Sequence, residues 1–327
     1  MTGHIVVLVN PSSGRGRGAE AAERAVARLR ELEAHGAHAA ELRVLSGASV
    51  DDTRRLAIEA VASKPRALVI VGGDGTLSSV LDAVVGSGIP LALVPAGTGN
   101  DLARALGLPF EGHEAAATAA ELAVVGVPRA IDVGEVESAT GARHFLTVAA
   151  LGFDAHVSER TNRLRWPRGR ARYYLALLIE LARLRPMRFE FAVDGGPLRA
   201  APGTLIAVGS TRSYGGGMPV CPAALPDDGL LDVTHVGPLG RVKLARLFPL
   251  LLRGAHVERP EVTTAQATRV DVDAPGLVVY ADGERVGAGR ATIRVVPGAL
   301  TVLVPTASGA AASSTDASAE ARREASA

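Results

Sequence analysis

The sequence is short of cysteine, of net charge and of long apolar runs, and each shortage excludes a class of protein. Its 327 residues include one cysteine, Cys221, so an internal disulfide is impossible and a cysteine metal cluster is excluded. The formal net charge is +1, so the charge does not indicate a nucleic-acid partner, and we expect none. No uninterrupted apolar run reaches the ~18 residues of a transmembrane helix.

Lysine is nearly absent too, because Lys64 and Lys243 are the two lysines and arginine supplies the other basic residues. The first apolar segment follows Met1 closely, without a basic-then-apolar leader. Together with the single cysteine, this predicts a reducing, cytoplasmic setting. A chain of this length that is 47% hydrophobic can form two domains with a sizeable core.

The most informative segment is 67–76, where an apolar run breaks into three glycines around one carboxylate, Asp74. The run 67–71 predicts a buried strand and 77–85 predicts a helix. Glycine lets a backbone turn sharply near a ligand, and a helix N-terminus favours phosphate. Asp74 would repel a bare phosphate, so the segment indicates a metal-bound nucleoside phosphate, unless the glycines serve the turn alone.

Strands and helices alternate through the first 128 residues. The predicted strands are 4–9, 42–45, 67–71 and 91–94, and the predicted helices are 19–34, 50–62, 77–85, 103–108 and 114–124. The alternation is typical of a parallel sheet with helices on both faces. We expect helix 50–62 to be capped near Asp51 or Asp52.

Three of these strands end in loops rich in Gly, Asn, Asp, Ser and Thr, namely 10–18, 72–76 and 95–101. Ligands of such sheets bind at the carboxyl ends of the strands, so we expect the loops to converge. The usual P-loop lysine is missing. Phosphate charge must therefore be met by N–H groups, by Mg²⁺ and by Arg15 or Arg17, unless both arginines are solvated.

Beyond residue 128 the pattern changes to short alternating segments, 131–137, 188–194, 268–273 and 291–296, separated by Gly and Pro turns. This pattern predicts an antiparallel sandwich or barrel, interrupted by one long helix at 172–185. We therefore predict an α/β nucleotide-binding domain at 1–128, a β-rich, sandwich-like domain at 129–306 and a disordered tail at 307–327. A return of the last strands, 293–304, to the first domain is left open.

With its loops assembled, the chain resembles the diacylglycerol kinase catalytic family, soluble bacterial lipid kinases related to sphingosine and ceramide kinases. The resemblance rests on NPSSG at 10–14, GGDGT at 72–76, PAGTGND at 95–101, GFDA at 152–155, PDDGL at 226–230 and DGE at 282–284. It implies an α/β nucleotide domain and a β-rich lipid-substrate domain, with the active site in the cleft.

The resemblance also implies ATP and Mg²⁺ as cofactors. The residues that it assigns to the nucleotide are Asn10, Ser12, Ser13, Gly14, Gly72, Gly73, Asp74, Gly75, Thr76, Ser78, Thr98 and Asn100. Asp74 is expected to act through Mg²⁺, and Asp101 to cap the next helix. The family often has Asn and Glu where this chain has Ser78 and Ser79, so a carboxylate of the metal network is missing at 79.

Asp282 and Glu284 flank Gly283 directly after the apolar segment 277–281. Residues two apart on an extended segment point to the same side, so we expect two carboxylates on one face, although a solvated hairpin turn fits the same residues. The resemblance favours Glu284 as the general base for a lipid hydroxyl, with Asp282 orienting it or binding metal. The reaction would be in-line transfer of the γ-phosphoryl group.

A second, structural Mg²⁺ is implied at Asp228, with the carbonyl groups of Leu225 and Leu230 as partners, although a plain turn is the alternative. Six arginines bracket Trp166; they are Arg160, Arg163, Arg165, Arg168, Arg170 and Arg172. Such a run is usually solvated, but basic residues near an aromatic suit an anionic membrane, so we predict peripheral membrane contact. The apolar residues Leu175, Leu178, Ile179 and Leu181 fit an acyl pocket or core packing.

The resemblance thus predicts an ATP-dependent lipid kinase that makes phosphatidic acid from diacylglycerol. The oligomeric state is left open, with a homodimer as one possibility. One alternative acceptor is a sphingoid base, ceramide or another lipid alcohol. An NAD kinase shares the Gly-Gly-Asp-Gly turn, but the other two loops and the Asp-Gly-Glu segment argue against it. A non-catalytic nucleotide- or lipid-binding regulator is the last alternative, and the presence of Asp74 and Glu284 argues against it.

Overall fold

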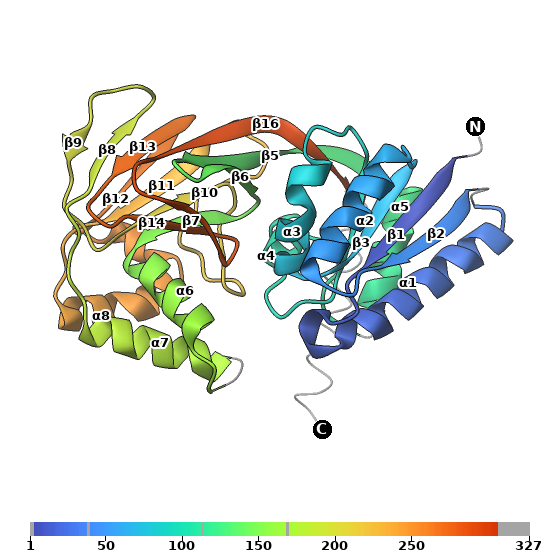
Figure 1. Cartoon of the computed structure of the whole chain (residues 1–327), viewed down its shortest axis with the longest axis horizontal. Helices are drawn as coiled ribbons and strands as arrows, with labels where there is room; N and C mark the ends of the chain where they lie inside the picture. Colours follow the sequence, from blue (N-terminus) through green and yellow to red (C-terminus); the bar gives the residue numbers. More distant parts are fainter. Residues whose placement is uncertain (1–2, 38–39, 113, 168–169, 307–327) are drawn as a thin grey trace. The chain divides into compact units, whose positions relative to one another are not determined.

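The computed structural model describes residues 3–37, 40–112, 114–167 and 170–306 (Figure 1). The predicted disordered tail lies outside these residues. The chain forms two compact units, the first Met1–Ala130 with Leu300–Ala327 and the second Ile131–Ala299. Two strands, β5 (Val127–Ser138) and β16 (Ala291–Val304), have residues in both units.

The first unit is built on a parallel sheet. Its strands are β1 (His4–Val9), β2 (Glu41–Ser46), β3 (Ala67–Gly72) and β4 (Leu91–Pro95). Their order is β2-β1-β3-β4, and every neighbouring pair runs parallel. The end of β16 pairs with β4, also parallel, through Val302 and Leu91. β1 and β3 are almost wholly buried, as expected of strands covered on both faces.

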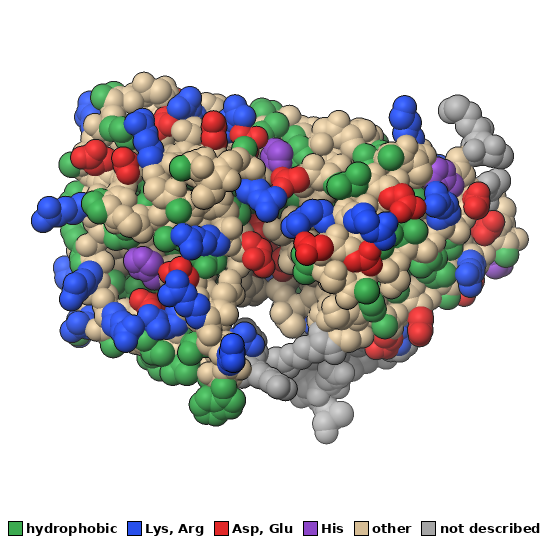
Figure 2. Space-filling model, in the orientation of Figure 1, with side chains coloured by type: hydrophobic (Ala, Val, Ile, Leu, Met, Phe, Trp, Pro, Cys, Tyr) green, Lys and Arg blue, Asp and Glu red, His purple; other side chains and the backbone are tan. Residues whose placement is uncertain are grey.

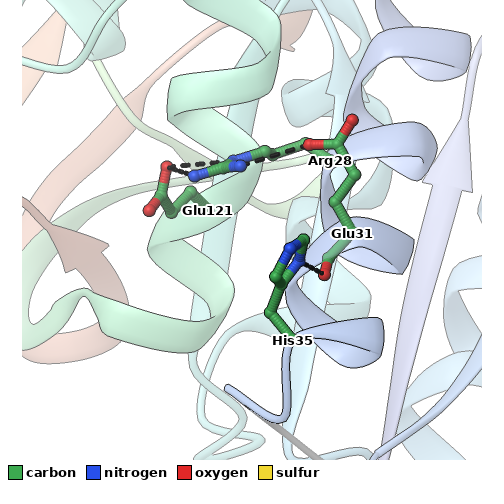
Figure 3. A network of polar contacts seen from close by, with 4 residues as sticks. All are labelled: Arg28, Glu31, His35 and Glu121. Atoms are coloured by element: carbon green, nitrogen blue, oxygen red, sulfur yellow. Dashed lines mark hydrogen bonds and ion pairs between the residues drawn. The ribbon is translucent and has the colours of Figure 1, made fainter.

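Helices cover this sheet in two packed pairs, α1 (Arg17–Ala34) with α5 (Ala115–Val125) and α2 (Val50–Ala62) with α3 (Asp74–Val84). Figure 3 shows the polar contacts of the first pair. Arg28 of α1 donates from Nη2 to Glu121 of α5 at 3.2 Å and from Nη1 to Glu31 at 3.2 Å. His35 is the C-cap residue of α1, and its ring Nδ1 lies 2.7 Å from the carbonyl oxygen of Glu31. The two carboxylates raise the pKa of Arg28.

The first turns of the helices differ from the sequence prediction. The cap of α2 is Ser49, whose hydroxyl accepts the N–H of Asp52 at 3.1 Å, and not Asp51 or Asp52. α3 begins at Asp74, within the Gly-Gly-Asp-Gly turn, rather than at Leu77. Likewise α4 (Asp101–Ala105) begins at Asp101 after Asn100, so Asp101 is its first residue and not its cap. Polar and glycine residues form these first turns, and an apolar period does not detect them.

The second unit is a sandwich of two largely antiparallel sheets. One contains the first part of β16 with β13 (Arg269–Asp273), β8 (Glu190–Val193), β9 (Arg199–Ala200), β5 and β6 (Gly141–Phe145). The other has the order β12-β11-β10-β7-β14-β15, with β12 (Val262–Ala267), β11 (Leu231–Val236), β10 (Leu205–Gly209), β7 (Val148–Gly152), β14 (Val278–Ala281) and β15 (Glu284–Ala288). Phe145, Leu151, Ile206, Val270 and Ile293 come from both sheets and pack in one core. The predicted fold class, an α/β domain with a parallel sheet and a second antiparallel domain, is confirmed.

A second core lies between the six-stranded sheet and the helices α6 (Phe153–Arg163), α7 (Arg170–Ala182) and α8 (Arg241–Leu251). Figure 1 shows α8 lying beside α7. The prediction of one long helix at 172–185 was therefore incomplete. It missed α6, whose sequence has few apolar residues, and α8, which contains Pro249. In the described residues no helix is both long and apolar enough to cross a membrane.

Candidate nucleotide and transfer site

Three glycine-rich loops meet at one edge of the first unit's sheet. They follow β1, β3 and β4, which are adjacent and parallel, so their carboxyl ends lie together. The loops approach so closely that added side chains would collide. A Cβ on Gly97 would lie 2.6 Å from the Gly73 Cα, and a Cβ on Gly14 would lie 1.9 Å from the Ala96 carbonyl oxygen. The predicted convergence is therefore present, and glycine is what permits the contact between these backbones.

Gly75 differs from the other glycines of this edge. It lies in the first turn of α3 and is exposed, and a Cβ there would meet no atom within 4 Å. Neither backbone strain nor internal packing requires glycine at this position. A side chain would instead project into open space at the helix N-terminus, where a ligand could approach.

Asp74 joins two of the loops. Its Oδ2 accepts the N–H of Asn100 at 2.7 Å, and its Oδ1 accepts the N–H of Asp101 at 2.9 Å. Asn100 adopts the left-handed conformation (φ 53°), and its own side-chain oxygen accepts the N–H of Gly97 at 3.0 Å. The carboxylate of Asp74 therefore holds the N-terminus of α4.

Asn10 joins the remaining loop to α3. Its Nδ2 donates to the Thr76 hydroxyl at 3.0 Å, while its Oδ1 accepts from the Ser12 N–H and hydroxyl at 3.2 and 2.8 Å. Thr76 is buried, whereas Ser12 and Thr98 are exposed and Ser13 and Ser78 are half-buried. Ser79 bonds back to the Thr76 carbonyl at 2.7 Å, so its hydroxyl belongs to the helix.

Arg17 bridges the first and third loops. Its Nε donates to the Gly14 carbonyl at 3.1 Å and its Nη2 to the Gly97 carbonyl at 2.6 Å. The alternative of a merely solvated arginine is therefore wrong for Arg17. The sequence offered a basic residue in a glycine-rich loop, but not the distant carbonyl that it reaches.

In the second unit, Asp282 and Gly283 form the two-residue turn of the β14–β15 hairpin. Ala281 pairs with Glu284, and both turn residues have positive φ, 50° and 84°. The expectation of two carboxylates on one face of an extended segment was wrong, because an Asp-Gly pair favours a tight turn with positive φ at both positions.

The hairpin turn is fastened on both sides of Gly283. Asp282 accepts the N–H groups of Leu146 and Thr147 at 2.8 and 2.9 Å and the Thr147 hydroxyl at 2.5 Å. Asn162 of α6 donates to the Gly283 carbonyl at 3.2 Å. Glu284 is the exposed residue that follows this fixed turn. Sequence reasoning missed Thr147 and Asn162, since a lone hydroxyl or amide gives no signal of a contact more than a hundred residues away.

The predicted structural metal site lies in a loop that Asp132 holds. Asp132, buried in β5, accepts the Gly229 N–H at 2.7 Å and donates its own N–H to the Pro226 carbonyl at 2.7 Å. Asp228 is exposed, and its Oδ1 accepts the Leu230 N–H at 3.0 Å, as in a plain turn. Leu225 is 44% exposed. In the described parts of the chain no group of three or more His, Cys, Asp or Glu residues is arranged to hold a metal ion.

The arginine run around Trp166 is partly engaged within the unit. Arg160 pairs with Glu180, Arg163 pairs with Glu159 at 2.8 Å, and Arg172 donates to the Pro167 carbonyl at 3.2 Å. Trp166 is 78% exposed and Arg165 is exposed. Arg168 and the side chain of Arg170 lie outside the description. Of the four apolar residues proposed for an acyl pocket, Leu181 packs on the core, Leu178 is exposed, and Leu175 and Ile179 are half-buried.

The GFDA segment at 152–155 places a carboxyl group in the apolar core. Asp154 is buried, its Oδ2 has no partner among the described residues, and Tyr214 is its hydrogen-bond partner. Burial raises the pKa of Asp154 to about 6 and also raises the pKa of Tyr214 and Tyr173 nearby. The motif therefore supplies a buried polar cluster that its sequence did not reveal.

Comparison with known proteins decides the family. The model of the diacylglycerol kinase catalytic domain matches residues 4–136, and that of the YegS C-terminal NAD kinase beta sandwich-like domain matches residues 147–304. A diacylglycerol kinase of Mycobacterium tuberculosis is 46% identical over 304 residues, which are 93% of this chain and 96% of the relative. The chain belongs to the diacylglycerol kinase catalytic family. The predicted resemblance is thus confirmed.

Other relatives place this diacylglycerol kinase family member among lipid kinases. A Pseudomonas fluorescens protein named "Probable lipid kinase YegS-like" is 35% identical, with 84% of this chain and 89% of the relative covered. The crystal structure of a Bacillus anthracis diacylglycerol kinase aligns with a TM-score of 0.68 at 22% identity, over 93% and 97% of the two chains. Yeast NADH kinase aligns at 0.52 and 12% identity, over 93% and 84%. At such identities the two structures show a common fold alone.

Proposed function

We propose that this lipid kinase family member transfers the γ-phosphoryl group of ATP to the hydroxyl of diacylglycerol, forming phosphatidic acid. The observation that carries the proposal is the meeting of three glycine-rich loops around Asp74 at one edge of the first unit's sheet. The printed name of the 46% identical relative supports diacylglycerol as the acceptor. A sphingoid base, ceramide or another lipid alcohol is the alternative within the same chemistry.

The polar groups of this edge fit a nucleoside triphosphate. Backbone N–H groups at the start of α3 and hydroxyls of Ser12, Ser13 and Thr98 are donors, and the open space beside Gly75 admits a ligand. We therefore propose that ATP binds at the three loops, through Asn10, Ser12, Ser13, Gly14, Gly72, Gly73, Asp74, Gly75, Thr76, Ser78, Thr98 and Asn100. Asn10, Thr76 and Asn100 serve mainly to hold the loops in place.

Asp74 fits a Mg²⁺ ion bound with the phosphates. Each of its oxygens accepts a backbone N–H, which fixes the orientation of the carboxylate at the loop edge. Mg²⁺ is commonly held by one or two carboxylates together with waters and substrate phosphates, so one carboxylate here suffices. When bound, Mg²⁺ would supply neutralisation of phosphate charge. We keep Asp228 with the Leu225 and Leu230 carbonyls as the proposed second, structural site.

We assign the general base to Glu284 and its positioning to Asp282. A lipid hydroxyl is a poor nucleophile, and a carboxylate within hydrogen-bond reach accepts its proton as the oxygen attacks the γ-phosphorus. The bond from that phosphorus to the β-phosphate oxygen then breaks, and ADP leaves. Glu284 is exposed and follows a turn that Asp282 and Asn162 both fasten, which limits the positions that its backbone can take.

The lipid acceptor implies work at a bilayer, and we extend the proposal to peripheral contact with an anionic membrane, partly through Arg165 and Trp166. The chain could act as a homodimer there. A cytoplasmic location, as predicted from the sequence, belongs to the same proposal.

Label transfer from γ-labelled ATP to a panel of acceptors in mixed micelles tests the proposal. The panel holds diacylglycerol, sphingosine, ceramide, a polyprenol and NAD, so each alternative has its own product. We expect label in phosphatidic acid. Label in another lipid would replace the acceptor, label in NADP would favour an NAD kinase, and ATP binding without transfer to any acceptor would favour a regulator.

A further inference from the structure

The second unit carries a groove along α8 for which the proposed reaction has no use. It has a volume of about 350 Å³. One wall is α8 itself, where Lys243, Arg246, Leu247 and Leu250 follow one another at i, i+3, i+4 and i+7 and so share one helix face. The other wall is the segment 259–261, after the short helix η2 (Ala255–Glu258), and Leu239 closes one end.

Positive charge predominates in the groove. Lys243, Arg246 and Arg259 face one carboxylate, that of Glu261, and α8 itself contains no acidic residue. Lys243 Nζ lies 3.4 Å from Glu261 Oε1, and the lysine side chain remains 68% exposed. One carboxylate cannot neutralise three cations, so the groove has an excess of positive charge at neutral pH.

The floor and the borders of the groove are apolar. Leu239 and Leu247 are buried beneath the cations. Outside the groove, Val242 is 64% exposed and lies one turn before Arg246 on α8. The neighbouring α7 exposes Leu178 by 62%. Figure 2 shows Lys and Arg side chains gathered at the end of this unit where α7 and α8 lie in Figure 1.

We propose that this groove, the α8 groove, binds the headgroup of an anionic phospholipid of the bilayer. The phosphate lies against Lys243, Arg246 and Arg259, and Val242 enters the interfacial layer beside them. Exposed apolar residues beside cations suit a bilayer surface, where an anionic headgroup meets hydrocarbon within a few ångströms. A soluble phosphorylated metabolite would not explain the exposed Val242 beside the cations.

This inference rests on the proposed function only in that a kinase for a lipid acceptor must reach a bilayer. It places the main docking contact on α8, whereas the sequence pointed to the arginine run around Trp166. Arg160 and Arg163 of that run already pair with Glu180 and Glu159, which leaves the run less net charge to offer a membrane.

The test is sedimentation of the full chain with vesicles of phosphatidylcholine alone or mixed with phosphatidylglycerol, without ATP. The groove variant is Lys243→Gln, Arg246→Gln and Arg259→Gln combined. Its matched control is Lys64→Gln, Arg66→Gln and Arg30→Gln, which removes the same one lysine and two arginines from exposed positions of the first unit. Thermal melting checks that both variants fold.

We expect the groove variant to bind the phosphatidylglycerol vesicles on the order of 100-fold more weakly, since each cation near an anionic surface contributes about 1 kcal/mol. The affinity of the control variant for the same vesicles should fall by less than about 10-fold. Equal losses in the two variants would reduce the effect to net charge and overturn the proposal, as would undiminished binding by the groove variant.

A second pair of measurements separates this inference from the proposed function. Val242→Ser should also weaken vesicle binding, although it leaves the charge unchanged. Both groove variants should phosphorylate a short-chain, monomeric diacylglycerol at the wild-type rate while losing rate on vesicles. If the wild type phosphorylates no lipid, the proposed function fails, whereas the binding comparison still decides the role of the groove.

Discussion

At the scale of single residues, aspartates of this chain fasten distant backbone segments. Asp74, Asp132, Asp194 and Asp282 each accept two main-chain N–H groups from another segment. Hydrogen bonds to a charged acceptor are stronger than neutral ones, so a single carboxylate can fix a loop. Two of the four stand in the motifs assigned to catalysis, where a fixed loop is what the chemistry needs.

The role of Asp282 as a positioning residue has a close internal control. Asp194 lies in a second Asp-Gly turn with similar positive φ values, 48° and 75°, and likewise accepts two N–H groups and a threonine hydroxyl. Asp282→Ala should lower the melting temperature more than Asp194→Ala, because the donors that lose their acceptor are partly buried at Asp282 but exposed to water at Asp194. Only Asp282→Ala should lower kcat, by about 10- to 100-fold, with the KM for ATP unchanged.

Steady-state kinetics over a pH series, with melting curves of both variants, checks this prediction. Because Asp282 positions the base, its loss should also move the acidic limb of the kcat profile, which a purely structural effect would leave in place. A parallel loss of kcat in the Asp194 variant would contradict a specific role for Asp282.

Burial of Asp154 predicts a pH-dependent stability. Its pKa is raised from 3.8 to about 6 in the fold, so the folded protein holds the proton more tightly than the unfolded chain. The stabilisation is full below pH 3.8, is lost as the pH rises to about 6 and remains lost above it. Two pH units correspond to about 3 kcal/mol.

The measurement is the difference in unfolding free energy between the wild type and Asp154→Asn as a function of pH. Asparagine stays neutral, so the unfolding free energy of the variant should rise relative to that of the wild type across that pH window. The difference should then stay constant above about pH 6. Tyr173 and Tyr214, which face Asp154, stay neutral throughout because burial raises the pKa of both. A difference that does not change with pH would mean that Asp154 titrates normally in the fold.

At the scale of elements, the spacing of apolar residues correctly predicted the bounds of some helices and strands. The strand His4–Val9 and the helix Val50–Ala62 have the expected bounds, because their apolar residues recur without interruption. The beginnings of α3 and α4 and the whole of α8 were not predicted, and the hairpin turn at Asp282–Gly283 was only the alternative to an extended segment. Backbone dihedrals and tertiary contacts decide these features, and neither is written in an apolar period.

The candidate site also has features that the sequence predicts and features that it does not. The three loops could be located because glycine and polar residues follow consecutive buried strands. The contacts that hold these loops and the base in place could not be predicted, because each partner is distant in the sequence. They are made by Arg17 in the loops and by Thr147 and Asn162 at the hairpin turn before Glu284.

Two glycines of the loops separate ligand binding from folding. Gly97→Ala places a Cβ 2.6 Å from the Gly73 Cα and 2.7 Å from Asn100 Oδ1, so it should destabilise the first unit and weaken ATP binding together. Gly75→Ala meets no atom and lies in a helix, where alanine is preferred over glycine by up to about 1 kcal/mol. Gly75→Ala should therefore keep or raise the melting temperature while raising the Kd for ATP at least tenfold.

Calorimetric titration of ATP with melting curves checks the pair. Normal ATP affinity in a stable Gly75→Ala protein would mean that the open space beside this residue is not part of the nucleotide site.

At the scale of the whole molecule, the chain divides its tasks between two units that are continuous with each other through β5 and β16. The first unit offers N–H groups, hydroxyls and Asp74, which suit phosphates. The second unit offers Glu284 on a fastened hairpin, an apolar core under α6 to α8 and the cationic α8 groove. This division agrees with the two family models, each of which matches one part of the chain.

The proposed reaction requires that Glu284 accept the proton of a lipid hydroxyl while the first unit holds ATP. It is tested most directly by label transfer from ATP to diacylglycerol in wild type, Glu284→Gln and Glu190→Gln, an exposed glutamate of the same unit. The account predicts that Glu284→Gln lowers kcat by about 10²- to 10⁴-fold with ATP binding intact, while Glu190→Gln transfers normally. Transfer at the wild-type rate by Glu284→Gln would contradict it.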